Sequence, residues 1–471
     1  MRRPLFAFLL LLLACRGARL PSAEGPPPGP EVWVAGDAAP GGEGSRERPL
    51  RSLAEALARG PGVRVRLQPG RYEGPAQLPP GAQLLAEAPG VVLLGGVEAP
   101  GGGRLRGLAV EAGGWGVRGR GALTLEDVTL SGQREGGVQL LAGVLQATGL
   151  RLKAPVAPGA VGLALQGGVR ARVQGLRLEG AFARGIELQG PAQLQLESLQ
   201  AVGPALVLHQ RGGQVRLRRA ALGGGEGVGL FVAGGTLELE DVVVLGHEYA
   251  LQTGQGSTLR VRGFASLGAQ RAGLGVVASR AQLEDVQVWG AGSFGALQLL
   301  NSDVQLHGFG LRDAQEYGLS ATQGRLEASA GAIVGTRGSG SDGGDALHLR
   351  EVEATLHTLR VQGAAGLGLL VAQGARARVR DLTLTACAGG GVVAETRGQV
   401  QLRGLQALAG TSPALVVMSG AQATLEGVQL EGGAQLLWTD CEQGARVSVG
   451  YGVPPAALRA RCVTRLAPRA P

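Results

Sequence analysis

The chain has 471 residues, of which 44% are apolar and only 3% aromatic, so it can bury a large core of small aliphatic side chains. Its 84 glycines show no regular spacing at every third position, which excludes a collagen-like triple helix. The formal net charge is +8 and comes almost wholly from arginine, since Lys153 is the only lysine. These arginines alternate with acidic residues and have few aromatic neighbours, so we expect no nucleic-acid partner.

The N-terminus has the features of an export signal. Two arginines precede an apolar run at 5–14 that is too short to span a bilayer. The run ends in Leu-Leu-Ala-Cys, which resembles the lipobox of bacterial lipoproteins and implies a signal at 1–15 with Cys15 acylated. Residues 16–30 are rich in Pro and Gly and predict a tether. We therefore expect an exported, lipid-anchored protein of the bacterial cell envelope, at the outer membrane or cell surface; the alternative is an ordinary signal peptide with an incidental cysteine.

Residues 31–95 predict an N-terminal cap and the first coils of a larger array. A strand is expected at 32–34, and Pro49 suits the first turn of a short helix. The expected apolar face of that helix has the i, i+3, i+4, i+7 spacing of Leu50, Leu53, Ala54 and Leu57. An alternating strand at 63–67 follows, and it leads into Pro-Gly-Arg-Tyr at 69–72. Such a helix would cover the unpaired edge of a stacked sheet.

Residues 96–435 repeat one unit: an apolar anchor, two turn-like residues, then apolar-x-apolar, as in Leu-Glu-Asp-Val at 239–242. Fifteen anchors recur at steps of 20 to 28 residues, at positions 105, 125, 147, 173, 196, 217, 239, 261, 283, 306, 328, 356, 379, 402 and 425. The units at Ala147 and Ala328 match least well. Each unit also carries a preceding Gly-apolar-x-apolar piece, so one coil should hold about three short strands. Stacked coils would form three parallel sheets around one apolar interior.

The residue two positions after the anchor is usually Gly or Asp, the types that enter the left-handed backbone region. The exceptions are Ser198, Arg219, Ala330 and Thr358. This column predicts one sharp corner, repeated in every coil. A helical repeat is disfavoured by the glycine density, and a leucine-rich-repeat horseshoe by the lack of an Asn or Cys ladder.

Residues 436–471 should form a C-terminal cap. Export permits disulfides, and Cys441 with Cys462 is the closest pair once Cys15 is acylated. Cys387 is then left over, as a small packed apolar residue.

The sequence from Val32 to Gly74 resembles the N-terminal module of pectate-lyase-like proteins, in which a strand, a Gly-rich loop and a short helix lead to Pro-Gly-x-Tyr. The resemblance extends through the repeats and implies an all-β fold, a right-handed parallel β-helix solenoid. The Asn-Thr-Asp, Asp-Asp and His-Gly motifs of polygalacturonases do not occur in that arrangement. The five histidines show no ligand spacing, so we expect no metal site and no cofactor.

Turns that follow the apolar-x-apolar strand should stack along one edge of the solenoid. The densest run of charged and aromatic residues lies there, and we take as candidate ligand-binding residues His247, Glu248, Tyr249, Arg271, Asp313, Glu316, Tyr317, Arg337, Asp342 and Asp345. Tyr faces stack on sugar rings, carboxylates accept hydrogen bonds from hydroxyls, and Arg pairs with a uronate. The alternative is that these are simply solvated turns.

Two functional classes remain open on the sequence. The first is a non-catalytic structural or carbohydrate-binding lipoprotein, a monomer held on a membrane by its lipid. The second is a polysaccharide lyase, hydrolase or epimerase acting on an acidic glycan, for which Glu248 and Glu316 are the acid and base candidates. The sequence contains no recognisable set of catalytic residues, so we favour the first class.

Overall fold

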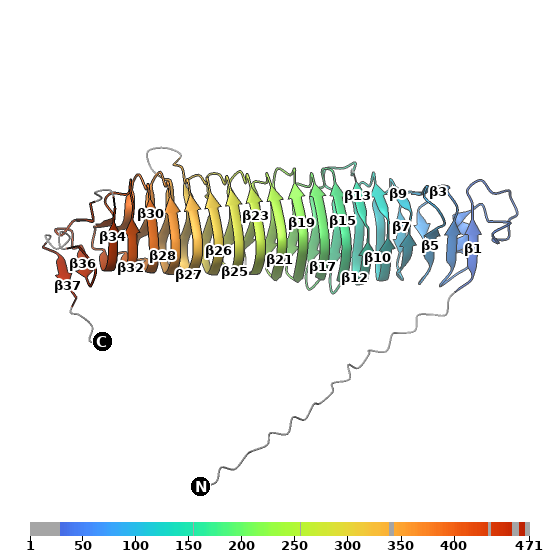
Figure 1. Ribbon diagram of the computed structural model, residues 1–471. Helices are drawn as coiled ribbons and strands as arrows, with labels where there is room; N and C mark the ends of the chain where they lie inside the picture. Colours follow the sequence, from blue (N-terminus) through green and yellow to red (C-terminus); the bar gives the residue numbers. More distant parts are fainter. Residues whose placement is uncertain are drawn as a thin grey trace, which may run out of the picture.

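The computed structural model describes residues 29–153, 155–254, 256–338, 343–431, 435–454 and 461–466. Thirty-seven strands and one short helix lie in these residues, and every paired strand is parallel to its neighbours. The chain winds into a long, straight rod with its strands stacked across the long axis (Figure 1). The fold is the predicted right-handed parallel β-helix, with about 17 turns against the fifteen predicted from the repeat.

Each coil contributes to three sheets, here called A, B and C in chain order within the coil. The cap and first coils contain short strands: β1 (Glu31–Val34), β2 (Arg64–Leu67), β3 (Gly70–Glu73), β4 (Ala76–Gln77), β5 (Gln83–Ala86), β6 (Val91–Leu94), β7 (Val97–Ala99), β8 (Gly103–Arg106), β9 (Ala109–Glu111), β11 (Thr129–Ser131) and β13 (Arg151–Lys153). Sheet A continues in β14 (Val161–Gln166), β16 (Arg184–Gln189), β18 (Leu206–Arg211), β20 (Val228–Ala233), β22 (Tyr249–Gly254), β24 (Ala272–Val277), β29 (Leu367–Ala372), β31 (Gly390–Ala394), β33 (Leu415–Val417) and β35 (Leu437–Thr439).

Sheets B and C share strands that bend at the corner between them. These are β15 (Arg170–Glu179), β17 (Gln193–Val202), β19 (Gln214–Gly223), β21 (Thr236–Leu245), β23 (Thr258–Leu267), β25 (Arg280–Trp289), β30 (Arg376–Thr385), β32 (Gln399–Ala407) and β34 (Gln422–Leu430). Longer strands join sheet A to the others: β10 (Trp115–Glu126), β12 (Gly136–Thr148), β26 (Leu297–Arg312), β27 (Tyr317–Val334) and β28 (Asp345–Gln362). The C-terminal end has β36 (Arg446–Val449) and β37 (Val463–Arg465).

The interior is one continuous apolar cluster that runs through the coils from Val32 to Val449. All fifteen predicted anchors belong to it and none is more than 4% exposed. The poorly matching units are regular in the structure, because Ala328 pairs in register with Leu306 on one side and Leu356 on the other. Pairing in register therefore compensates for a weak local pattern, because each coil is hydrogen-bonded to a neighbouring coil on both sides.

The corner between sheets B and C has the predicted left-handed backbone in every one of the fifteen coils. Gly175 has φ 71° and Asp241 has φ 55°. The four residues that departed from the Gly or Asp pattern adopt the same conformation, with φ of 65° at Ser198, 52° at Arg219, 54° at Ala330 and 51° at Thr358. The corner is therefore imposed by the stack even where the residue type does not favour it.

The N-terminal cap differs from the prediction in the helix. The helix α1 covers only Leu53–Leu57, with Ser52 as the N-cap accepting a hydrogen bond from the backbone N–H of Glu55. Leu50 lies before the helix, where its backbone pairs with Val34 in an isolated β-bridge. Ala54 is exposed, and the buried helical residues are Leu53, Ala56 and Leu57. The predicted start at Pro49 was wrong because the Ser cap and the bridge satisfy the backbone better than an earlier helical turn.

The ends of the rod are held by local contacts. At the N-terminal end the hydroxyl of Tyr72 donates to the carbonyls of Val34 and Gln68, and burial raises the pKa of Tyr72 to about 12. At the other end Cys441 and Cys462 form a disulfide, with their Cα atoms 5.4 Å apart. Cys387 is fully buried in the core as a free thiol. No helix in the described residues is long and apolar enough to cross a membrane.

Candidate functional site

The turns that precede the strands of sheet A lie side by side, as the repeat predicts. Their backbones continue the ladder of the coils: the N–H of Arg271 donates to the carbonyl of Glu248 at 2.9 Å, and that of Phe294 to the carbonyl of Arg271 at 3.0 Å. Side chains of successive turns are therefore neighbours at the strand spacing of ~4.8 Å. We call this row the polar strip; its described members are Glu248, Tyr249, Arg271, Phe294, Asp313, Glu316, Tyr317 and Arg337.

Four members of the polar strip form one compact cluster. The guanidinium of Arg271 pairs with the carboxylate of Glu248 at 2.7 Å. It also lies 4.9 Å from the ring centroid of Phe294 and 5.8 Å from that of Tyr249. The rings of Tyr249 and Phe294 are stacked with an interplanar angle of 17°. Burial raises the pKa of Tyr249, whose hydroxyl is a hydrogen-bond donor. The cluster presents aromatic faces beside a charged pair that is open to solvent.

The second half of the polar strip is less compact. Asp313 and Arg337 pair at 3.0 Å and both are exposed. Tyr317 turns its ring toward His348, with the centroids 4.8 Å apart and the rings edge to face. The side chain of Glu316 is partly exposed beside them. Acidic, basic and aromatic side chains thus alternate along the turns, but only neighbouring coils bring them into contact.

Two predicted residues do not lie on the open surface of the strip. His247 is fully buried, and burial lowers its pKa. Asp345 is also buried, where it accepts hydrogen bonds from His348 at 2.8 Å and from the backbone N–H of Leu367. Its function in the fold is therefore to orient His348. Asp342 lies outside the described residues.

A cluster that the sequence patterns did not indicate lies on the outer face of sheet A. The carboxylate of Glu187, only 5% exposed, accepts hydrogen bonds from Arg184 at 2.9 Å and from Gln189 at 3.0 Å. It also lies 3.7 Å from Nδ1 of His209, while the Nε of Arg211 approaches Nε2 of that ring at 3.1 Å. Burial, together with the positive charge of Arg211, lowers the pKa of His209. A neutral imidazole is therefore held between a carboxylate and a guanidinium.

The coil period could have revealed this cluster. Glu187 pairs with His209 and Gln189 with Arg211 in the register of β16 and β18, at a separation of 22 residues. The outward residues of sheet A continue from there as a single column, which we call the sheet A floor: Glu187, His209, Phe231, Gln252, Gly275, Gln298, Ser320 and His348. The polar strip borders this floor along one side, because Tyr249 and Tyr317 are the first residues of strands whose fourth residue lies in the floor.

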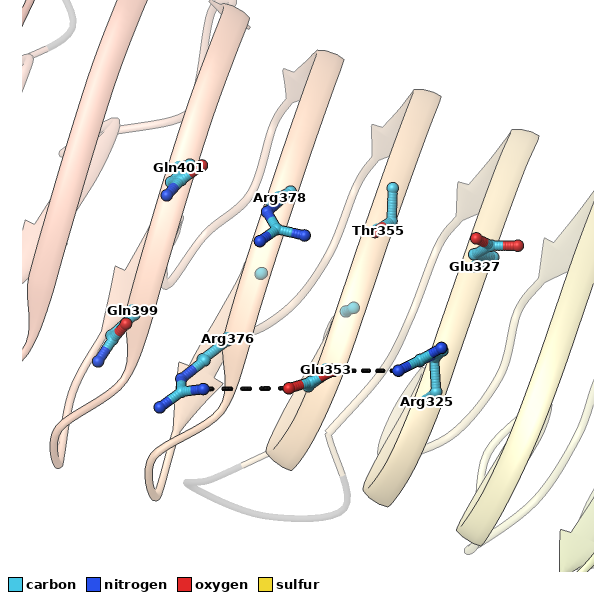
Figure 2. A pocket seen from close by; sticks show the side chains of 10 residues that line it. Arg325, Glu327, Glu353, Thr355, Arg376, Arg378, Gln399 and Gln401 are labelled. Carbon is cyan, nitrogen blue, oxygen red and sulfur yellow. Dashed lines mark hydrogen bonds and ion pairs between the residues drawn. The ribbon is translucent and has the colours of Figure 1, made fainter.

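Hollows in the surface also lie on the outer face of sheet B. Figure 2 shows one of them, where Arg325 and Arg376 both approach Glu353 from neighbouring coils. Its walls also carry Arg378, Gln399 and other polar side chains. These are exposed, ion-paired residues without an aromatic ring among those that line the hollow, so the chemistry for ligand recognition is weaker here than beside the polar strip.

Neither region offers a metal site in the part of the chain that the structure describes. No group of three or more His, Cys, Asp or Glu side chains lies close enough there to hold a metal ion. Two pairs of one carboxylate and one imidazole do occur among the described residues: Glu187 with His209, and Asp345 with His348. The chemistry that these pairs can offer is hydrogen bonding and proton transfer.

No protein-family model matches the chain, and no curated protein sequence matches it. Among solved structures, the pectate lyase Pel9A is similar over 52% of this chain and 77% of its own, with 17% identity and a TM-score of 0.41. The PL6 family alginate lyase AlyGC is similar over 89% of this chain and 93% of its own, with 10% identity and a TM-score of 0.40. The catalytic unit of a GH87 α-1,3-glucanase from Streptomyces thermodiastaticus is similar over 90% of this chain and 72% of its own, with 14% identity and a TM-score of 0.34. These likenesses concern the β-helix fold.

Proposed function

We propose that the protein binds an extended carbohydrate along the sheet A floor and the polar strip, without turning it over. The observation that carries this proposal is the concentration of surface aromatic rings. Only 3% of the residues are aromatic, yet Phe231, Tyr249, Phe294 and Tyr317 all lie on this one face. The coils from Phe231 to Tyr317 span roughly 19 Å at the strand spacing. Aromatic faces distributed along one axis suit a polymer of sugar rings.

The polar groups around these rings have the chemistry that such a ligand needs. The Glu248 carboxylate accepts hydrogen bonds from hydroxyl groups, and the Arg271 guanidinium donates to them or to a carboxylate. Gly275 leaves the floor open between Gln252 and Gln298, since a Cβ placed there would contact only Gln252, Leu251 and Tyr249 at 3.6 Å or more. Sugar rings would therefore reach the amide groups of the sheet A floor, beside the aromatic side chains of the polar strip.

One observation favours the second functional class, an enzyme acting on an acidic glycan. Glu187 and His209 are buried beside the exposed Arg211, and the imidazole has a lowered pKa, a combination that is common at catalytic sites. In this alternative the neutral His209 takes a proton and Arg184 or Arg211 binds a substrate carboxylate. Structural ion-pair networks perturb pKa values in the same way, so we place binding first.

The proposal is tested with a soluble fragment that begins at residue 31, probed against acidic and neutral glycans on an array. Changing Tyr249 and Tyr317 to Ala together should abolish binding and leave the unfolding midpoint nearly unchanged, since partly exposed turn residues contribute little to stability. The matched control changes Thr258 and Gln282 on the outer face of sheet B to Ala. Retained binding in the tyrosine variant, or no binding by the unaltered fragment, would overturn the proposal.

The same array distinguishes the enzyme alternative. Each bound glycan is incubated with the fragment, and its length and absorbance are followed over time. Shortened or unsaturated products that are lost in His209→Gln would establish catalysis and make the non-catalytic proposal wrong. Intact glycan after long incubation would leave binding as the function.

We further propose that Cys15, which lies outside the described residues, is acylated and holds the rod at a membrane of the cell envelope. The support is the lipobox-like sequence before it and the Pro-rich tether after it. Partition into the detergent phase should be lost in Cys15→Ser, while Cys387→Ser serves as the cysteine control. Unchanged partition in the first variant would contradict the anchor.

A further inference from the structure

The outer face of sheet C carries an exposed apolar stripe in the middle of the rod. Each coil presents two outward residues there, which form two columns along the axis. In the coils from β17 to β25 the large apolar members are Val202, Val243, Leu245, Leu267 and Trp289, which are 36–61% exposed. They make up half of the large exposed apolar side chains in the described residues. A contiguous patch of this kind on a soluble surface marks an interaction site.

The first column reads the same from either end over five coils, and the second column places small residues at the same distance from its centre as large ones. The first column is Arg177, Gln200, Ala221, Val243, Ala265, Gln287 and Gly310, which is symmetric about Val243 from Gln200 to Gln287. The second column is Glu179, Val202, Gly223, Leu245, Leu267, Trp289 and Arg312, with Leu245 at its centre. Consider two chains with their C sheets face to face, related by a two-fold axis that runs parallel to the strands at the level of the central coil. Each column of one chain then lies opposite the same column of the other chain, in reverse order. Such self-complementarity is what a two-fold dimer interface requires.

We propose that this stripe binds a second copy of the chain, with the two rods antiparallel and their C sheets packed face to face. In that register Val243 and Leu245 meet the same residues of the partner. The small side chain of Val202 faces the large ring of the partner's Trp289. Ala221 faces the partner's Ala265, and Gln200 faces the partner's Gln287. Two sheets packed in this way lie about 10 Å apart.

Gly223 supports this arrangement independently. Its φ is not in the left-handed region, and a Cβ built there would meet only Leu245, at an ordinary contact distance of 3.5 Å. Neither the backbone nor the packing of a single chain therefore requires glycine at this position. In the antiparallel dimer the missing side chain makes room for the partner's Leu267.

The charges at the two ends of the stripe also favour the antiparallel register. Glu179 at one end faces the partner's Arg312 at the other, and the two-fold axis creates this pair twice. Arg177 faces the partner's Gly310, and Lys153 faces the partner's Val334, so no cation faces another across these columns. Rods placed parallel would set Arg177 against the partner's Glu179, but they would leave Arg312 against the partner's Gly310. They would also set Trp289 and Val202 against glutamines and Arg151 against the partner's Lys153. The proposed dimer differs from the monomer that we expected from the sequence. It does not depend on glycan binding.

The interface is one sheet wide and roughly 29 Å long from Glu179 to Arg312. It is therefore at the small end of stable interfaces, and we expect association that depends on concentration, with a Kd of about 1 µM or weaker. Sedimentation of the fragment from residue 31 should show a monomer at low concentration and a dimer at high concentration. Leu245→Glu should remain monomeric throughout. Gln362→Glu, in the same column beyond the stripe, is the matched control and should still dimerise.

Orientation is tested by charge exchange. Arg312→Glu and Glu179→Arg should each weaken the dimer roughly ten-fold, because each places like charges together at both ends. The double exchange should restore the dimer, since the opposite charges then meet again. Failure of the double exchange to recover would exclude the antiparallel register.

A cross-link gives the same answer independently. Val202→Cys alone and Trp289→Cys alone should form no covalent dimer on oxidation, whereas a mixture of the two should. Self-linking of each single variant would overturn the antiparallel arrangement. A fragment that stays monomeric at about 100 µM, or whose stripe variants lose only affinity for anionic vesicles, would overturn the dimer.

Discussion

Sheets A and B are formed by the same coils, but the charged side chains on their outer faces differ in how far they are buried. On sheet B the ion pairs run along the axis in the open: Glu238 accepts from Arg216 and from Arg260, whose side chains are 53% and 57% exposed. Burial of Glu238 opposes its ionisation, but the hydrogen bonds from the two arginines outweigh it and hold its pKa below the usual range. On sheet A the carboxylate of Glu187 is almost completely covered.

This difference indicates what each face does. Alternating exposed charges at the strand spacing satisfy one another and keep the stacked surface soluble, and each pair contributes little to stability. A covered carboxylate with an imidazole and two guanidiniums must be compensated by specific hydrogen bonds, and such arrangements are concentrated at functional sites. The ladder on sheet B explains how a chain with net charge +8 disperses its arginines without a dense basic patch.

The largest effect on stability is expected at Glu187. Its replacement by Ala leaves Arg184 and Gln189 without their acceptor and should lower the free energy of unfolding by about 2–3 kcal/mol. Glu238→Ala on sheet B should cost less than about 1 kcal/mol, because its partners are solvated. Urea denaturation of the two variants measures the difference. Equal losses would mean that burial does not distinguish the two faces.

A smaller effect is expected from pH. The pKa of His209 and that of His247 are lowered by burial, so the unfolded chain binds protons more readily than the folded one. Stability should therefore fall as the pH decreases through the unfolded histidine value of about 6.5. His209→Gln should flatten this dependence, and His307→Gln on the exposed face of sheet B should not. Thermal melts from pH 8 to pH 5 test it, and identical pH profiles for the two variants would refute the assignment.

The smallest effect on stability is expected at the polar strip. Arg271→Ala removes the pair with Glu248 and the contact with Tyr249 and Phe294, but all of these are partly exposed, so the loss should stay within about 1 kcal/mol. Its effect on glycan binding should be larger, because the exposed rings lose the cation that orients them. Calorimetric titration with a glycan identified on the array, compared with Arg260→Ala on sheet B, separates the two effects. Equal binding by both variants would place the ligand elsewhere.

The coil period made most of the fold predictable from the sequence. A solenoid places each residue beside the one a single coil away, so the anchors, the corner and the row of turns all follow from counting along the chain. The helix at the cap did not, because Leu50 has a suitable pattern for a helix but its backbone pairs with a distant strand.

What the sequence alone determined was therefore the axial arrangement: which residues stack, which point inward and where the backbone turns. Burial across the surface was decided only by the tertiary structure. His247 and Glu248 are adjacent in one turn, yet the first is fully covered and the second partly exposed. The same holds for Glu187, an outward residue that its neighbours enclose. The physical reason is that exposure depends on the path of each turn and on side chains from several coils at once, whereas stacking depends only on the repeat length.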